Sequence, residues 1–169
     1  KLAQLVAMLA QFEQHIEDDT PLADVLPTIF NKYPVRYRDY TLRELCQEMH
    51  DLYVSFDVKD LQKAMFRQES LPAVAMNPQD ANSAFIRGDV ELVRICDAAG
   101  RVAAEGALPY PPGVLCVVPG EIWGGAVQRY FLALEEGVNL LPGFSPELQG
   151  VYSETDADGI KRLYGYVVK

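Results

Sequence analysis

The sequence predicts an α+β protein in which N-terminal helices are followed by a small, mostly antiparallel sheet. Apolar residues recur at spacings of three and four along residues 2–17, as they do on one face of a helix. Apolar and polar residues alternate over residues 149–153 and 162–168, which is typical of strands. The turn-forming run Asp156-Ala-Asp-Gly159 separates these two stretches, so we expect a C-terminal β-hairpin with helices before it.

Further helices are predicted from their start signals. Thr41 and Glu44 have the spacing of a capping box, in which each residue satisfies a backbone donor near the other. Asp57 is expected to cap a helix that runs through Phe66, and Asn77-Pro78 to begin one over residues 78–86. The remaining predicted segments are a short helical piece ending at Leu26, a loop over residues 33–40, and a helix over 126–136 that stops at Gly137.

Three short apolar or alternating runs are predicted to be strands: Leu71–Met76, Val90–Ile95 and Val114–Val118. The last of these lies in the most unusual segment, Leu108–Glu121, which holds four prolines and two glycines. Because proline fixes φ and has no backbone donor, we expect two rigid corners around one short buried strand. Such a frame would hold Tyr110 and Glu121 in set positions at its two ends.

The composition limits the classes of function. The chain has 169 residues, 49% of them hydrophobic, and a net charge of -9 at pH 7. This length suits one packed domain with an appendage, and the acidic surface disfavours nucleic acid and anionic membranes as partners. An acidic surface can concentrate cationic ligands, but taken alone it is better explained as ordinary solubility charge.

The cysteines and histidines do not predict a metal site. Three widely spaced cysteines without a C-x-x-C pair fit a reducing compartment, and we expect the cytoplasm. Cys116 is expected to act as a small buried hydrophobic residue. His15 and His50 have no second histidine at ligand spacing. Asp156-x-Asp158-Gly159 begins like a calcium loop, but Ile160 and Val167 occupy later ligand positions, so a hairpin turn is favoured.

Glu121 and Tyr110 are the candidate functional residues, and each has an ordinary structural interpretation. The carboxylate of Glu121 follows Pro-Gly and could bind a cation or cap the helix that begins after Gly124-Gly125. Tyr110 lies between prolines and would more commonly pack with its hydroxyl satisfied than act as an acid. From the residues alone, no catalytic constellation is visible.

The segment Leu108-Pro-Tyr-Pro-Pro-Gly113, followed by Val118-Pro-Gly-Glu121, resembles the signature of the C-terminal domain of bacterial ornithine, lysine and arginine decarboxylases. Ile122-Trp123, Tyr130–Gly137, Leu140–Phe144 and Glu147–Tyr152 are similar to the ornithine branch, and Thr41–Leu45 with Gln47 and His50 to the helix that opens this domain. The resemblance divides the chain into residues 1–30, the end of a preceding domain, and 31–169, the decarboxylase C-terminal domain.

The resemblance implies a piece of a pyridoxal phosphate enzyme of fold type I that converts L-ornithine to putrescine and CO2. In this family the cofactor is bound to the lysine of a Ser-x-His-Lys motif, and none of the lysines here follows Ser-x-His. No catalytic or cofactor residue is therefore assigned to this chain. The implied role is to shape the substrate entrance through Tyr110, Pro111, Pro112, Gly113 and Glu121.

The implied partners are an N-terminal catalytic domain of the same polypeptide and further copies in a homodimer or larger oligomer. The start at Lys1, within a helix and without an N-cap, favours a fragment of a longer protein. The apolar face of residues 2–16 would then lie against the missing part. The alternatives are a stand-alone binding or regulatory module with the same fold, or a piece of a lysine or arginine decarboxylase.

Overall fold

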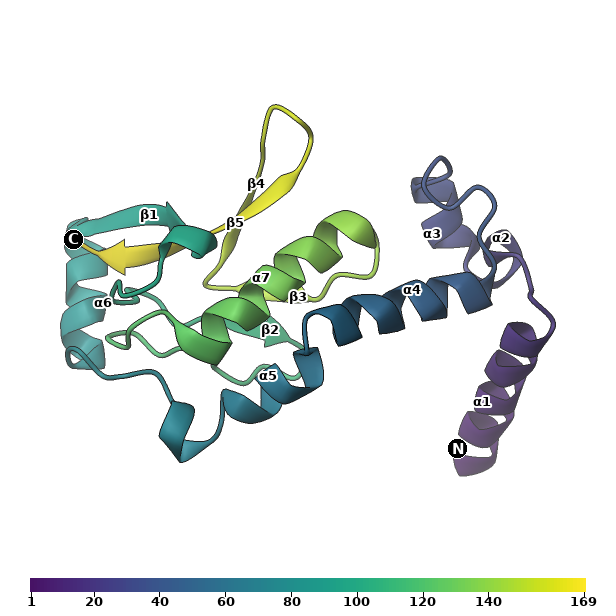
Figure 1. Ribbon diagram of the computed structural model, residues 1–169, viewed down its shortest axis with the longest axis horizontal. Helices are drawn as coiled ribbons and strands as arrows, with labels where there is room; N and C mark the ends of the chain where they lie inside the picture. The colour runs from purple at the N-terminus through teal and green to yellow at the C-terminus, as the bar shows by residue number, and fades with distance from the viewer. The chain divides into compact units, whose positions relative to one another are not determined.

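A computed structural model describes all residues, 1–169, and the chain folds as two compact units. The N-terminal unit comprises residues 1–53 and the C-terminal unit residues 54–169 (Figure 1). The helices and short strands follow the predicted α+β order. None of the helices is both long and apolar enough to cross a membrane.

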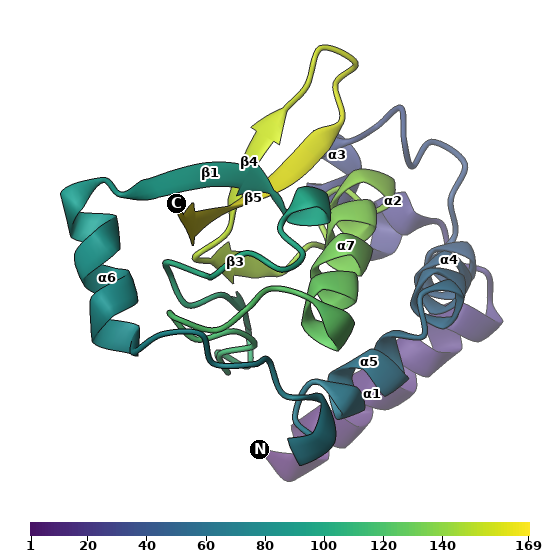
Figure 2. The same ribbon diagram turned by 60° about the vertical axis from the view of Figure 1, so that its left-hand side comes forward.

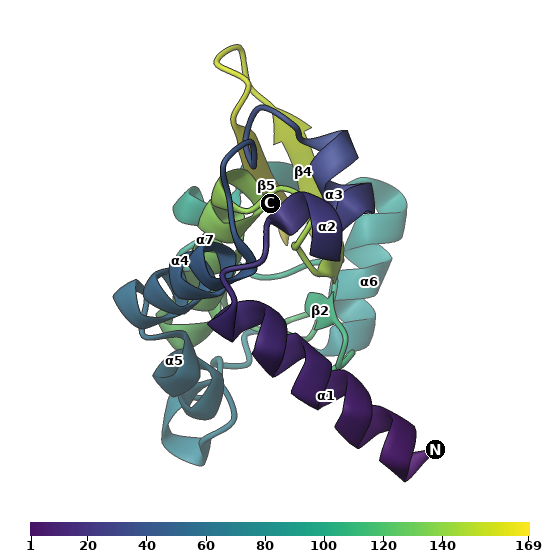
Figure 3. The same ribbon diagram turned by 90° about the vertical axis from the view of Figure 1, so that its right-hand side faces the viewer.

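The N-terminal unit is helical (Figure 3). Its elements are α1 (Leu2–Glu17), α2 (Leu22–Val25), α3 (Pro27–Lys32) and α4 (Leu42–Ser55), of which the last two residues belong to the C-terminal unit. The predicted capping box is confirmed, because Glu44 N donates to Thr41 Oγ1 at 3.2 Å and Thr41 N donates to Glu44 Oε2 at 2.8 Å. The short helix α3 was not predicted.

The N-terminal unit has a small core beside one helix that contributes nothing to it. Leu22, Tyr37, Leu42 and Leu45 are buried. Backbone hydrogen bonds fix the two connecting loops, with Leu22 N donating to Tyr40 O at 2.8 Å and Leu42 N to Thr20 O at 3.0 Å. In contrast, α1 has no buried residue.

The C-terminal unit combines helices with two small antiparallel sheets. Its elements are α5 (Val58–Ala64), η1 (Gln68–Ser70), α6 (Pro78–Arg87), β1 (Val90–Arg94), η2 (Ile95–Asp97), β2 (Leu108–Tyr110), α7 (Gly125–Leu140), β3 (Glu147–Gln149), β4 (Tyr152–Thr155) and β5 (Lys161–Val168). One sheet has the order β1-β5-β4, with β5 in the centre, and the other pairs β2 with β3 (Figure 2).

The predicted C-terminal hairpin is confirmed as β4 and β5. The strands pair from Tyr152↔Tyr164 to Thr155↔Lys161, and the Asp156 carboxylate accepts from Asp158 N at 3.0 Å and Ile160 N at 2.9 Å. This carboxylate therefore closes the turn, as an Asx-type turn does. Gln149, which the alternation pattern places in the hairpin, instead belongs to β3.

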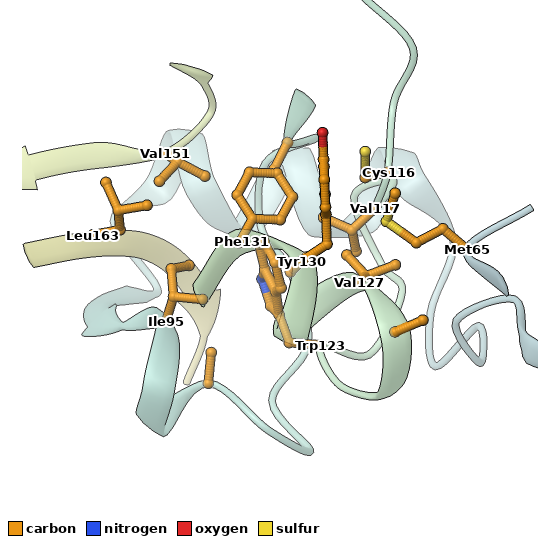
Figure 4. Packing of buried hydrophobic residues seen from close by; sticks show 14 of the residues in the cluster. Met65, Ile95, Cys116, Val117, Trp123, Val127, Tyr130, Phe131, Val151 and Leu163 are labelled. Atoms are coloured by element: carbon orange, nitrogen blue, oxygen red, sulfur yellow. The ribbon is translucent and has the colours of Figure 1, made fainter. Parts of the chain in front are cut away.

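The core of the C-terminal unit lies between α7, α5 and the inner face of β5 (Figure 4). The rings of Trp123 and Phe131 meet edge to face, with centroids 5.4 Å apart, and neither residue is exposed by more than 2%. Along β5, Leu163 and Val167 are buried and alternate with partly exposed residues. One face of this sheet is therefore covered by the core, and the other is partly covered by α6, where the rings of Phe85 and Tyr166 meet edge to face with centroids 5.2 Å apart.

Two predicted strands are wrong. Residues 71–76 form only an isolated bridge, Val74↔Glu121, because their backbone hydrogen bonds reach only the turn at residues 120–122 and no longer ladder follows. Residues 114–118 also make a single bridge, Ala107↔Val117. The strand of this segment is β2 instead, in which Pro109 pairs with Leu148. Pro109 O accepts a hydrogen bond from Gly113 N at 3.1 Å, so the backbone polar groups of Pro109 point away from β3. A proline fits this position because β3 needs no backbone donor from it.

The predicted helix end at Gly137 is also wrong, since α7 continues to Leu140. Gly137 O accepts a hydrogen bond from Leu141 N at 2.9 Å, so the helical pattern passes through the glycine. A glycine inside a helix costs about 1 kcal/mol relative to alanine. Burial of Val138 and Leu141 just beyond it offsets this cost.

Candidate functional site

The segment Leu108–Glu121 forms an exposed loop followed by a firmly held turn. All residues from Tyr110 to Leu115 are exposed, and Cys116 and Val117 then enter the core. Two backbone hydrogen bonds attach this re-entry to the rest of the unit, from Cys116 N to Ala107 O at 2.9 Å and from Ala107 N to Val117 O at 3.0 Å. The loop is therefore anchored at both ends while its tip faces solvent.

Tyr110, Pro111, Pro112 and Gly113 form the tip of this loop. Tyr110 is 53% exposed, and its ring covers Gly113, where an added Cβ would lie 3.1 Å from Tyr110 Cδ2. Gly113 has φ of +80°, a conformation that other residues adopt only with strain. The Tyr110–Pro111 and Pro111–Pro112 peptide bonds are cis. The tip thus presents an aromatic ring and two prolines to the surface.

Glu121 lies in the turn that ends the segment. Its carboxylate Oε2 accepts a hydrogen bond from Val118 N at 2.7 Å, and its own N donates to Val118 O at 3.0 Å. Its backbone oxygen accepts from Ala103 N at 2.8 Å. The helix-cap interpretation of Glu121 is wrong, because α7 has Gly124 as its N-cap and no side-chain cap. The carboxylate of Glu121 therefore closes the local turn through one of its two oxygens.

No hydrogen bond or ion pair joins Tyr110 to Glu121, so the two ends of the segment do not form one reacting pair. Cys116 is 6% exposed, as expected for a small hydrophobic residue, and burial raises the pKa of its thiol to about 11. Of the two histidines, His15 Nδ1 lies 3.2 Å from Thr20 Oγ1 and His50 is exposed. No three His, Cys, Asp or Glu side chains are gathered as metal ligands.

The sequence reasoning missed a set of polar side chains around the end of α7. Glu135 is only 7% exposed and accepts a hydrogen bond from Leu163 N at 2.6 Å. Asn139, one helical turn later, bonds both backbone groups of Lys161. The sequence holds one sign of this contact: Glu135 lies on the same face of the helix as the apolar residues Val127, Phe131 and Val138. A carboxylate on an apolar helix face indicates a buried polar contact.

A pocket of about 150 Å³ lies next to these contacts. Val151 and Leu163, which Figure 4 shows side by side at the edge of the core, form part of its floor. Its remaining lining comes from the end of α7, from β3 and the loop before it, and from the hairpin: Val138, Ser145, Pro146, Leu148, Ser153 and Lys161. Sequence reasoning had no means to find this pocket, because its residues come from four separate elements.

The residues present do not fit a pyridoxal phosphate site. The cofactor needs a lysine in an enclosed pocket, where its amine can be desolvated. Every lysine of this chain is exposed. They are Lys1, Lys32, Lys59, Lys63, Lys161 and Lys169.

Comparison with known proteins gives a consistent match. Residues 59–169 match the family described as Orn/Lys/Arg decarboxylase, C-terminal domain. Over all its residues, the chain is 89% identical to the constitutive ornithine decarboxylase of Escherichia coli and 68% identical to the inducible one. It covers 24% of the length of the constitutive enzyme and 23% of the length of the inducible enzyme.

The solved structures agree with this match. Lysine decarboxylase A from Pseudomonas aeruginosa superimposes with a TM-score of 0.87 at 31% identity, over 99% of this chain and 22% of that one. The chain thus spans about a quarter of the length of these relatives. The chain belongs to the Orn/Lys/Arg decarboxylase family and contains its C-terminal domain.

Proposed function

We propose that this chain is the C-terminal part of an ornithine decarboxylase, a pyridoxal phosphate-dependent carboxy-lyase that converts L-ornithine to putrescine and CO2 for polyamine synthesis in the cytoplasm. The observation that carries the proposal is the difference in identity between relatives. It is 89% and 68% to two ornithine enzymes but 31% to a lysine enzyme of the same fold.

The chemistry belongs to the part of the polypeptide that binds the cofactor, and this chain has a supporting role. When bound, pyridoxal phosphate accepts the electron pair that the departing carboxylate leaves behind. The exposed tip Tyr110–Gly113 and the turn carboxylate of Glu121 are proposed to line the substrate entrance. A negative charge at Glu121 would attract an amino acid that carries two ammonium groups.

The exposed apolar face of α1 supports a large intramolecular partner. Leu2, Leu5, Val6, Met8, Leu9 and Phe12 are each at least 44% exposed. A continuous apolar face of this kind on a helix is normally covered. We propose that the N-terminal catalytic domain covers it, with residues 1–30 as the end of that domain and 31–169 as the C-terminal domain. Assembly into a homodimer or larger oligomer belongs to the same proposal.

A direct assay tests the substrate. The full-length protein that carries this chain is incubated with pyridoxal phosphate and either L-ornithine, L-lysine or L-arginine, and the amine products are quantified. We expect putrescine from ornithine with a kcat/KM at least about tenfold above that for the other two, a difference of about 1.4 kcal/mol in transition-state binding. A preference for lysine or arginine would overturn the ornithine assignment.

Residues 1–169 alone test whether the chain is an independent enzyme, whereas the second candidate, a stand-alone regulatory module, is tested by whether a full-length decarboxylase carries this chain. With pyridoxal phosphate added, we expect no visible absorption band of bound cofactor and no decarboxylation, whereas the full-length protein shows both. If no full-length decarboxylase carries this chain, the stand-alone module replaces the proposal.

A further inference from the structure

The β4–β5 hairpin extends beyond the end of α7 (Figures 1 and 2). The pocket is lined by residues of this hairpin and of the end of α7. Residues 161, 163, 165 and 167 of β5 face inward, and Ser153 lies opposite Leu163 across the hairpin. Near Gly165 and Val167 this inner face is filled by the core. Nearer the turn this face meets Val138, Ser145 and Pro146 of the loop before β3, and Leu148 of β3, and about 150 Å³ remains between them.

The walls of this pocket are held in place by side chains of α7. β1 pairs with β5 only from Tyr164 onward, so the preceding residues lack a strand on that side. Asn139 replaces it, donating from Nδ2 to Lys161 O at 2.9 Å and accepting from Lys161 N at 2.8 Å. Glu135 accepts from Leu163 N at 2.6 Å. The backbone of Lys161 is therefore fixed in position, which limits where its side chain can reach.

The floor and the rim of the pocket differ in polarity. The floor is apolar: Val138, Val151 and Leu163 are at most 8% exposed. The rim carries three polar side chains, Ser145, Ser153 and Lys161, and none of them has a side-chain hydrogen bond or ion pair.

No acidic residue lines the pocket. Two carboxylates near the lining residues in sequence are already occupied: Asp156 binds Arg162, and Glu147 accepts from Gln149. The single charge at the rim is therefore an unneutralised ammonium, on a protein whose net charge is -9.

We propose that this pocket binds a short aliphatic carboxylate. The alkyl chain would lie on the apolar floor, and the carboxylate would accept hydrogen bonds from Lys161 and the two serine hydroxyls. A space of about 150 Å³ can hold about six carbon atoms. A polyamine or basic amino acid is disfavoured by Lys161, and inorganic phosphate would leave the apolar floor uncovered. The site is separate from the loop at Tyr110–Gly113, and it does not depend on the reaction proposed above.

The test uses the full-length protein, with any bound pyridoxal phosphate reduced onto its lysine so that an amine cannot condense with it. The three probes have equal chain length: hexanoate, 1-hexanol and hexylamine. Binding is measured by ligand-observed saturation-transfer NMR titration. We expect hexanoate to bind about tenfold more tightly than 1-hexanol, because only the carboxylate gains the charged hydrogen bond. Hexylamine should bind most weakly. Equal affinities for hexanoate and hexylamine would overturn the proposal.

Variants locate the site. Lys161→Glu should lower the affinity for hexanoate at least about tenfold, and Ser153→Phe should remove binding by filling the pocket from exposed strand β4. Lys59→Glu changes charge identically at an exposed position on α5 and should bind hexanoate as the wild type does. If Lys161→Glu lowers folding yield, Lys161→Met retains the apolar stem and removes only the charge. Unchanged hexanoate affinity in Lys161→Met and Ser153→Phe would place the binding elsewhere and overturn the proposal.

Discussion

Glu135 of α7 and Leu163 of β5 are joined by a hydrogen bond of 2.6 Å from the Leu163 N–H to the Glu135 carboxylate. The carboxylate is 7% exposed and also lies 3.5 Å from Arg94 Nη2 and 3.7 Å from Arg162 Nη1. A buried charge is tolerated when it is both paired and hydrogen-bonded, and this one meets both conditions. The contact couples the main helix of the C-terminal unit to its central strand.

Glu135→Ala should therefore destabilise the protein strongly. The substitution leaves the Leu163 N–H and the Arg94 guanidinium without this acceptor, while Arg162 keeps Asp156. We expect a loss of about 3 kcal/mol in the free energy of unfolding. Glu135→Gln keeps an acceptor oxygen and should cost about 1 kcal/mol. Urea denaturation measures both. The neighbouring Glu136→Ala, at an exposed position, serves as the control and should change little. Equal losses for Glu135→Ala and Glu136→Ala would contradict this account.

Gly150 should not tolerate a side chain. Its φ is +70°, and an added Cβ would lie 2.0 Å from the backbone oxygen of Gly106. We expect Gly150→Ala to cost at least about 3 kcal/mol, from backbone strain together with displacement of a neighbouring backbone segment.

Gly100→Ala is the matched control for Gly150. Gly100 has φ of +79° but nothing within 4 Å of an added Cβ, so only the strain of about 1 kcal/mol applies. Thermal unfolding of both variants separates strain from steric overlap. If the two melting temperatures fell equally, the close approach to Gly106 would not matter energetically.

The capping box at Thr41 and Glu44 should protect the first turn of α4. Thr41→Ala removes the acceptor for Glu44 N, which typically costs about 1 kcal/mol. Amide hydrogen exchange should then be about fivefold faster in that turn. Asp39→Ala changes an exposed residue just before the helix and is expected to leave the exchange rates unaltered.

The buried thiol of Cys116 should make stability depend on alkaline pH. Burial raises the pKa of Cys116 to about 11, above the value of about 8.5 in an unfolded chain. The folded state therefore holds this proton more tightly, and its contribution is present below about pH 8.5 and lost as the pH rises towards 11. The stability advantage of wild type over Cys116→Ala should shrink over this range. A pH-independent difference would show that the thiol does not resist ionisation.

The proposed entrance role of Glu121 is tested by Glu121→Gln in the full-length enzyme. Glutamine retains an oxygen that can accept from Val118 N, so the turn is preserved while the charge is removed. We expect a higher KM for ornithine, with the difference from wild type decreasing as salt is added. Glu136→Gln removes an equal charge elsewhere. If both variants leave KM unchanged, Glu121 does not act on the substrate.

Local signals predicted most helices and the hairpin correctly. The Thr41/Glu44 pattern and the Asn77-Pro78 start specify contacts within four residues, and both appear as hydrogen bonds in the structure. The turn at Asp156 is equally local. The resemblance to decarboxylases was also carried by contiguous residues, chiefly Leu108–Gly113 and Val118–Glu121.

The errors arose where distant residues decide the outcome. Leu71–Met76 has the apolar composition of a strand but lies at the surface with one bridge, to Glu121. Gly137 looks like a helix end, yet the burial of Val138 and Leu141 extends the helix past it. The pocket at Lys161 depends on four elements meeting, which no short sequence pattern encodes.

The two α7 side chains that bind β5 have a further consequence, for association between molecules. An unpaired strand edge offers a row of donors and acceptors to any passing strand, which is a common route to aggregation. On the helix side, the N–H and C=O of Lys161 already bind Asn139, and the N–H of Leu163 binds Glu135. A foreign strand therefore has no template there, and Asn139→Ala should raise the tendency of the hairpin to add strands from other chains.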